Sequence, residues 1–201
     1  MKRPIKSHAL IIALAVTAAA LPGAAVANSY REKGKPVVIA GTALGVTPPR
    51  DWNRLSFSPG KKTETWTLDG EELNDVTFFA GIAAGSPLVR EVSKKHKPLP
   101  KFTGETLLVE VPELLEGTYR AAREVADFKV SSAKPDRFLG RDGIRFTFDY
   151  VDGEDLPRRG EGRATIVNGL LYLVTYTAPR LHYYEQTLED FHTLSDTATL
   201  N

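Results

Sequence analysis

The chain has no cysteine among its 201 residues. This absence excludes disulfide bonds, a thiol nucleophile, a thiolate metal site and a cysteine that could carry a lipid anchor. The folded state therefore depends on side-chain packing alone. A chain of this length buries about 70% of its unfolded surface on folding, which is sufficient for one core without covalent cross-links.

Long hydrophobic runs are also scarce. The longest lies at 9–21, where thirteen mostly apolar residues follow three positive charges. This run is shorter than the roughly 18 to 20 apolar residues that cross a bilayer. A proline, a glycine and several small residues come next, a pattern typical of a secretory signal peptide. We therefore predict a signal peptide at 1–27, cleavage after Ala27, and a periplasmic or secreted protein with no transmembrane segment.

Neither sign of charge dominates, because 26 Lys and Arg residues face 25 Asp and Glu residues. Removal of the predicted signal peptide takes away Lys2, Arg3 and Lys6, which leaves 23 cations against 25 anions and a formal charge of −2. A domain that binds nucleic acid usually has a clear basic excess. We therefore predict no nucleic-acid partner.

The rest of the chain is expected to form a single domain. Residues 28–36 combine charges with turn formers and lack apolar periodicity, which predicts a flexible lead-in before a domain at 37–201. Strand formers bounded by glycine and proline, a polar stretch and a helical spacing of apolar residues then follow one another. They predict three strands, a long loop and a helix, at 37–49, 63–70, 75–84, 85–104 and 112–126.

The second half of the domain is expected to hold four strands and a final helix. Asn168-Gly169 predicts a two-residue hairpin before the last strand. This strand is apolar on both faces, with Tyr172 and Leu173 pointing to opposite sides, so both faces need cover. The fold class is therefore predicted as α+β, an antiparallel sheet covered by helices in an α/β/α sandwich. The strands are expected at 127–138, 144–151, 160–167 and 170–179, and the helix after Pro179.

Three strings carry a resemblance to a known fold, "VTPPRDW" at 46–52, "FLGRDGIRFTFDY" at 138–150 and "VNGLLYLVTYTAP" at 167–179. Together with the order of elements, they resemble the PsbP-like sandwich fold. Its members include photosystem II extrinsic proteins, a yeast nuclear-import factor and many bacterial secreted proteins and lipoproteins. The resemblance implies the fold and an accessory role like that of the extrinsic members. It does not specify one function, because this fold hosts unrelated roles.

The segment "HYYEQTLEDFH" at 182–192 contains a candidate metal site. On a regular helix, His182, Glu185, Glu189 and His192 share an arc of about 80°. Imidazole and carboxylate groups suit zinc or copper. However, the two histidines would lie about 15 Å apart along the axis, so only a neighbouring pair could share one ion. The pattern predicts a solvated helix face, with a metal-binding protein as the alternative.

A basic cluster in the predicted loop at 85–104 is a candidate surface for an anionic or protein partner. A locally positive patch can steer an acidic partner even when the whole protein is nearly neutral. A second basic group lies in "PRRGEGR" at 157–163, which we interpret as a hairpin rim beside the loop. The candidate binding residues are Arg90, Lys94, Lys95 and Lys97 in the loop, and Arg158 and Arg159 in the second group.

The sequence lacks the motifs of common catalytic sites. Ser86 is not part of a Gly-x-Ser-x-Gly elbow, and "GTALG" at 41–45 lacks the Lys-Ser/Thr of a phosphate loop. No cofactor is predicted. The sequence therefore favours a non-catalytic accessory protein that binds a protein or an envelope component. A metal-binding protein and a hydrolase with a site assembled from distant residues are the alternatives.

Overall fold

The computed structural model describes residues 28–93, 95, 97–123, 125 and 127–201. The predicted signal peptide lies outside the described residues. In chain order the elements are β1 (Ser29–Arg31), β2 (Val37–Val38), η1 (Ile39–Gly41), β3 (Leu44–Val46), β4 (Trp52–Arg54), β5 (Thr63–Thr67), β6 (Asp75–Ala83), η2 (Leu108–Glu110), α1 (Val111–Ala122), β7 (Phe128–Phe138), β8 (Arg141–Val151), β9 (Pro157–Val167), β10 (Leu170–Pro179), α2 (Tyr183–Asp196) and β11 (Thr199–Leu200).

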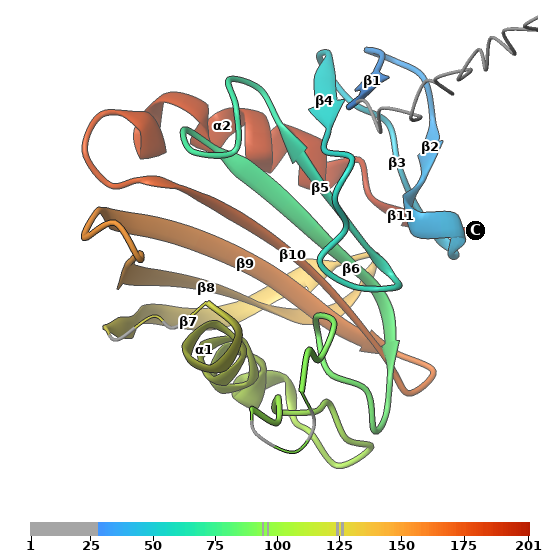
Figure 1. The fold of residues 1–201 in the computed structure, drawn as a ribbon. Coiled ribbons are helices and arrows are strands. Elements are labelled where there is room, and N and C mark those ends of the chain that lie inside the picture. Colours follow the sequence, from blue (N-terminus) through green and yellow to red (C-terminus); the bar gives the residue numbers. More distant parts are fainter. Residues whose placement is uncertain (1–27, 94, 96, 124, 126) are drawn as a thin grey trace, which may run out of the picture.

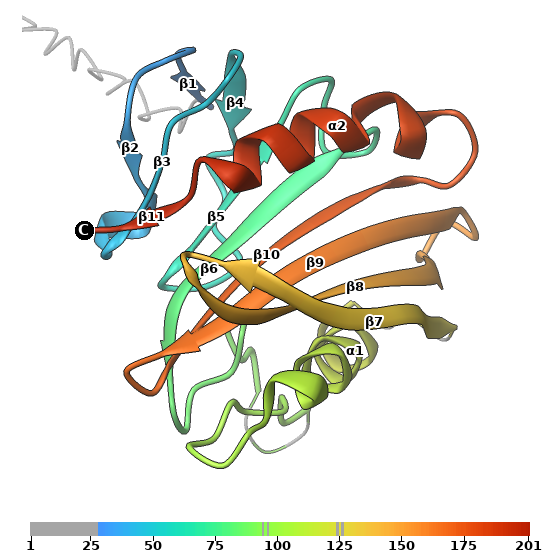
Figure 2. The same cartoon turned by 180° about the vertical axis from the view of Figure 1, so that it is seen from behind.

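Eight strands form one antiparallel sheet in the order β1-β4-β5-β6-β10-β9-β8-β7. A smaller antiparallel sheet, β11-β3-β2, joins the carboxyl-terminal residues to the early part of the chain. The large sheet is curved, with α1 on one side and α2 on the other (Figure 1, Figure 2). The architecture is therefore mostly antiparallel sheet with two helices.

Side-chain alternation along the strands divides the core into two halves. Phe79 and Leu173 pack in the cluster beneath α1, whereas their chain neighbours Phe78 and Val174 pack in the cluster beneath α2. Tyr172 and Leu173 are both buried, in opposite clusters. The prediction that the last long strand is covered on both faces is confirmed.

The helices cover only part of each face. On the α1 side, the loop at 85–104 adds Leu88 and Phe102 to the core, and on the α2 side the small sheet adds Leu44 and Val46. Eight strands spaced about 4.8 Å apart span roughly 34 Å, whereas one helix covers only about 10 Å. The α+β class is therefore confirmed. However, a loop and a second sheet form part of the cover that was predicted to be helical.

Two glycines allow the aromatic side chains of β8 to lie flat against β9. A Cβ atom at Gly160 would lie 2.3 Å from the Phe148 ring, and one at Gly162 would lie 2.4 Å from the Phe146 ring. Real Cβ atoms do not approach a ring this closely, so no larger residue fits without moving it. The Phe148 ring stacks on Phe128 of β7 at a centroid distance of 5.0 Å.

The turn between β9 and β10 has the geometry that its sequence predicts. Asn168 and Gly169 have φ angles of 52° and 73°. A two-residue hairpin turn of type I′ needs positive φ at both positions, which asparagine and glycine tolerate best. The predicted hairpin is confirmed.

Two local expectations are wrong. Ser29–Arg31, assigned to a lead-in without regular structure, pair with β4 as β1. Residues 157–159, interpreted as part of a hairpin rim, belong to β9, which continues through the strand predicted at 160–167 and pairs with strands on both sides. The charged side chains at 157–163 suggested solvent exposure, but they find partners within the fold. Arg163 Nε, for example, donates to Asp136 at 2.8 Å.

Both predicted helices are present with shifted bounds. The first begins with Pro112 in its opening turn, as expected, and ends at Ala122, four residues before the predicted end. The second begins at Tyr183. No helix in the described part of the chain combines the length and apolarity that a membrane span requires.

Candidate binding pocket

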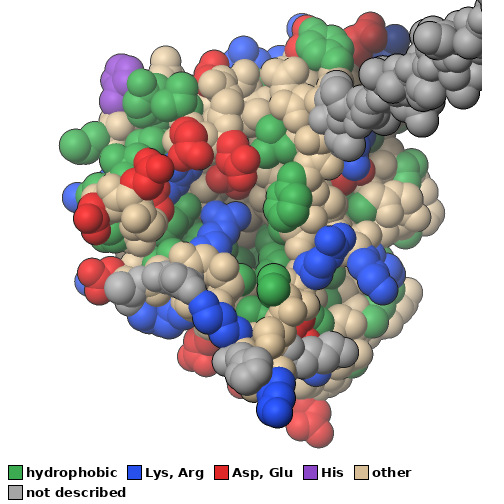
Figure 3. Space-filling model, viewed as in Figure 1, with side chains coloured by type: hydrophobic (Ala, Val, Ile, Leu, Met, Phe, Trp, Pro, Cys, Tyr) green, Lys and Arg blue, Asp and Glu red, His purple; other side chains and the backbone are tan. Residues whose placement is uncertain are grey.

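A pocket of about 610 Å³ lies on the α1 side of the large sheet. Its walls come from four parts of the chain: the segment at 55–59, strands β5 and β6 with the turn between them, the loop at 85–104, and α1 with the residue that follows it. Figure 3 shows the molecule in the orientation of Figure 1, with exposed hydrophobic side chains close to lysine and arginine side chains. The pocket is thus assembled from segments far apart in sequence.

The floor of the pocket is formed by Thr65 of β5 and by Thr77 and Phe79 of β6. The two threonine hydroxyls lie 3.0 Å apart and share a hydrogen bond. Thr77 also donates to Asp75 at 3.2 Å. These hydroxyls satisfy one another within the protein, so they do not require a ligand.

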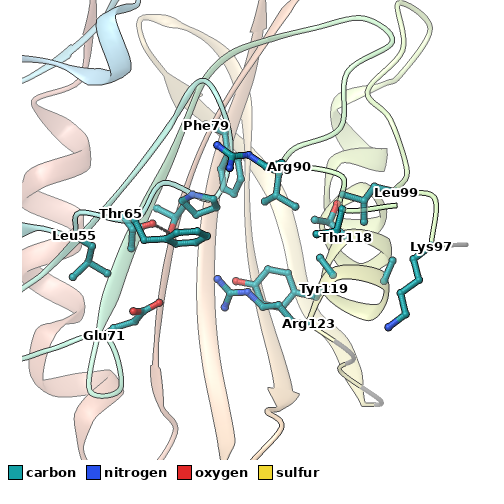
Figure 4. Close-up of a pocket in the computed structure, with 17 residues that line it drawn as sticks. Leu55, Thr65, Glu71, Phe79, Arg90, Lys97, Leu99, Thr118, Tyr119 and Arg123 are labelled. Atoms are coloured by element: carbon teal, nitrogen blue, oxygen red, sulfur yellow. Dashed lines mark hydrogen bonds between the residues drawn. The ribbon is translucent and has the colours of Figure 1, made fainter. Parts of the chain in front are cut away.

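The α1 wall contributes Tyr119 and Arg123, which point into the pocket (Figure 4). The Tyr119 ring is buried and packs edge-on against Phe128 at a centroid distance of 5.4 Å. The Arg123 guanidinium lies 4.6 Å from the centre of the Tyr119 ring. Burial raises the pKa of Tyr119, so its hydroxyl stays protonated at neutral pH.

The described residues of the loop at 85–104 form one wall of the pocket, and both ends of the loop are anchored. Leu88 and Phe102 are buried in the core beneath α1. The Gly85 amide donates to the Phe102 carbonyl at 2.8 Å, and the Phe102 amide donates to the Ser86 carbonyl at 3.0 Å. Leu99, which is buried, lines the pocket.

The rim of the pocket exposes two large apolar side chains from different walls. Phe57 is 68% exposed and Val92 is 98% exposed. Isolated exposed apolar residues are ordinary on a protein surface, but apolar residues beside a concave site are typical of binding surfaces. The rim therefore extends the apolar lining outward.

One end of the pocket is polar. Glu71 and Arg123 also line an adjoining pocket of about 200 Å³, together with Asp75 and Arg158. Arg158 is buried, donates to a backbone carbonyl at 3.0 Å and lies 4.0 Å from the Asp75 carboxylate. Burial, followed by the charge of Asp75, raises the pKa of Glu71. The larger pocket is thus apolar over most of its lining and polar beside Glu71 and Arg123.

The structure divides the predicted basic residues of the loop. Arg90 and Lys97 line the larger pocket, although Lys97 extends away from the other labelled side chains in Figure 4. Lys95 is exposed and lines neither pocket. Lys94 lies outside the described residues.

Arg158 and Arg159 do not form one patch with each other. As neighbours on β9 they point to opposite faces of the sheet. Arg158 lines the smaller pocket on the α1 side, whereas Arg159 donates to Asp149 at 2.9 Å on the other face. Only Arg158 lies on the same side as the loop, and it is buried rather than exposed.

Of the predicted metal-site residues, Glu185, Glu189 and His192 lie on α2, whereas His182 does not. His182 precedes α2 with a φ of 73°, so it lies outside the helical repeat. Glu185 is exposed, and His192 lies 2.9 Å from Glu161 and 3.8 Å from Glu189. Among the residues that the structure describes, no group of three or more His, Asp and Glu side chains is arranged to hold a metal ion.

Sequence reasoning missed several residues of the pocket, including Glu71, Phe57 and Arg123. A signal was present for Arg123, because it follows Tyr119 by four residues and therefore lies on the same side of α1. Phe57 gives no such signal. Its place at the rim depends on how the segment at 55–59 folds over the α1 side.

A search of solved structures finds similar chains at low sequence identity, among them the following three. Cyanobacterial PsbP (CyanoP) from Synechocystis sp. PCC 6803 matches with a TM-score of 0.53 and 12% identity, over 92% of this chain and 99% of that one. The Ran-binding protein Mog1p of Saccharomyces cerevisiae gives 0.48 and 9%, over 84% and 96%. LpqN, involved in cell envelope biogenesis of Mycobacterium tuberculosis, gives 0.33 and 9%, over 91% and 87%. No protein-family model matches the sequence, and no curated protein matches it.

Proposed function

We propose that this chain, whose fold is PsbP-like, is a non-catalytic accessory protein that binds an envelope component in the pocket between α1 and the loop at 85–104. The observation that carries the proposal is the pocket of about 610 Å³ with its mostly apolar lining. Pockets of roughly 300 to 1,000 Å³ that combine apolar walls with a few polar groups are typical small-molecule sites. A loop fixed on a rigid sheet is a common place for recognition.

The composition of the lining supports binding rather than catalysis. Neither pocket has a serine or a histidine among the described residues that line it, so a serine–histidine pair is not available there. The hydroxyl of Thr118 donates to the Leu114 carbonyl at 2.8 Å, and those of Thr65 and Thr77 bond to each other. A hydroxyl held in this way is not activated as a nucleophile.

The predicted signal peptide supports the proposed compartment. A protein exported to the periplasm, or released from the cell, meets lipids and other envelope components that a cytoplasmic protein does not. The proposed location and the proposed pocket ligand are therefore consistent with each other.

Binding of the uncharged dye Nile red to the purified protein tests the proposal. We expect its fluorescence to rise with the wild type and to rise less with Ala122→Trp, because Ala122 lines the pocket and the larger ring would occupy part of it. Ala133→Trp is the matched control, since Ala133 is exposed on β7 and lines neither pocket. Equal fluorescence with all three proteins, or no rise with the wild type, would defeat the proposal.

A further inference from the structure

Two arginines, Arg90 and Arg123, line the larger pocket. The guanidinium groups of Arg90 and Arg123 make no hydrogen bond or ion pair within the part of the chain that the structure describes. A guanidinium has five N–H donors and stays charged at all ordinary pH values. By contrast, Arg158 and Arg163 pair with carboxylates of the fold. The donors of Arg90 and Arg123 are therefore available to a ligand.

Arg123 is also held in a defined place. It caps the end of α1, where its amide donates to the Tyr119 carbonyl at 2.9 Å. Its guanidinium lies over the Tyr119 ring, which is itself fixed in the core. Stacking on an aromatic face leaves the edge of a guanidinium free to donate hydrogen bonds. The group is thus preorganised to meet an acceptor in the pocket.

The charge balance of the larger pocket favours an anion. Arg90, Lys97 and Arg123 line it together with one acid, Glu71. In the smaller pocket, Asp75 already accepts hydrogen bonds from two threonine hydroxyls and lies beside Arg158.

We infer that the pocket binds a single-chain anionic amphiphile, such as the carboxylate of a fatty acid. The apolar chain would lie against Phe57, Phe79 and Val92, and the carboxylate would accept hydrogen bonds from Arg123. The apolar lining argues against a small hydrophilic anion. The pocket volume of about 610 Å³ suits a single amphiphile molecule rather than an aggregate of amphiphiles. This inference rests on the proposed function and names the class of its ligand.

Calorimetric titration of the purified protein with three twelve-carbon amphiphiles tests the inference. Dodecanoate, dodecanol and dodecylamine, used below their aggregation concentrations, share one chain and differ in headgroup charge. We expect dodecanoate to bind most tightly. Arg123→Gln should weaken dodecanoate about tenfold, the usual loss when a charged hydrogen bond is removed, and should leave dodecanol unchanged.

Two further variants separate charge from shape. Arg123→Lys keeps the positive charge and should keep the preference for dodecanoate. Arg120→Gln removes a cation from the same helix that pairs with Glu116 at 2.8 Å and does not line the pocket, so it should bind like the wild type. Circular dichroism shows whether each variant retains its fold.

The outcomes distinguish this inference from the proposed function. Equal affinity for dodecanoate and dodecanol, or tightest binding of dodecylamine, would overturn the anionic ligand and leave the apolar pocket standing. An equal loss of dodecanoate and dodecanol in folded Arg123→Gln would also overturn it. Failure of all three ligands together with Nile red would remove both proposals.

Discussion

At the scale of single residues, Glu64 joins separate parts of the chain through one buried carboxylate. Its oxygens lie 3.3 Å from Arg31 and 3.2 Å from Arg54. They also accept hydrogen bonds from the Trp66 indole at 3.1 Å and from the Ala40 amide at 2.8 Å. Glu64 therefore connects the short strands β1 and β4 and the 3-10 helix η1 to β5. Each of these short elements has few backbone hydrogen bonds of its own, which would hold it only weakly.

We expect Glu64→Ala to lower the free energy of unfolding by about 3 kcal/mol, because removal of one partner leaves buried donors without an acceptor. Glu116→Ala is the control, since Glu116 pairs with Arg120 at the surface and such pairs contribute less than about 1 kcal/mol. Urea unfolding followed by circular dichroism measures both. A loss for Glu64→Ala as small as that of the control would contradict this role.

Asp136 gives the protein an acid-dependent contribution to stability. Burial, the largest influence, pushes its pKa up, but the hydrogen bond from Arg163 and the charges of Arg163 and Arg145 outweigh burial, so the pKa of Asp136 is lowered. A carboxyl group with a lowered folded pKa stabilises the fold above its unfolded pKa, near 3.9. This contribution is lost as the pH falls through the folded pKa.

We therefore expect Asp136→Asn to destabilise the protein by about 2 kcal/mol at pH 7, since a charged hydrogen bond is lost. The difference from the wild type should shrink below about pH 4, where this carboxyl begins to protonate in the unfolded chain. Urea unfolding of both proteins at pH 7 and pH 3 measures it. An equal difference at the two pH values would show that the charge of Asp136 does not stabilise the fold.

At the scale of elements, the contact between β8 and β9 depends on glycine. We expect Gly162→Ala to cost about 1 to 3 kcal/mol, because the added methyl would meet the Phe146 ring, which is packed in the core. Gly153→Ala is the matched control, since a Cβ atom there meets nothing within 4 Å. Thermal unfolding of the two variants checks the difference. Equal melting temperatures would indicate that the ring moves aside at no cost.

The long elements could be predicted from the sequence, and the short ones could not. Strands β7 to β10 extend over 10 or 11 residues, which is enough for alternation to appear, and Asn168-Gly169 sets the last hairpin. Strands β1 and β4 have three residues each, too few to show a period. They form because distant partners, including Glu64, fix them. The resemblance to the PsbP-like fold is confirmed by the structural likeness to CyanoP.

The pocket could not be predicted from the sequence, because it too depends on contacts between residues that are distant in the chain. Its walls are separated by up to 68 positions, from Leu55 to Arg123, and nothing local indicates that they meet. The loop at 85–104 was predicted as a contact surface, and two of its predicted residues, Arg90 and Lys97, line the pocket. Binding at this loop stays a prediction. The charged residues at 157–163 led to the wrong prediction of a hairpin rim, because charge was taken to indicate solvent exposure. In the fold, the carboxylates and guanidiniums of this strand pair with neighbouring strands and with α2.

At the scale of the whole molecule, we expect export of the protein and cleavage of the leader. The protein isolated from the envelope fraction should begin at Asn28, as shown by amino-terminal sequencing. Ala25→Glu replaces a small residue beside the predicted cleavage site and should leave the leader attached. A wild-type protein that keeps Met1 and stays in the cytoplasm would contradict the proposed location.

The central claim is that the pocket between α1 and the loop at 85–104 is the binding site. Two-dimensional NMR spectra of the ¹⁵N-labelled protein, with and without dodecanoate, test it most directly. The account predicts that the backbone amides of Val92, Ala122 and Arg123 shift, while the amide of Glu189 on α2, on the other face of the sheet, does not. Shifts concentrated in the amides of α2, with no shift of the amides around the pocket, would contradict the claim.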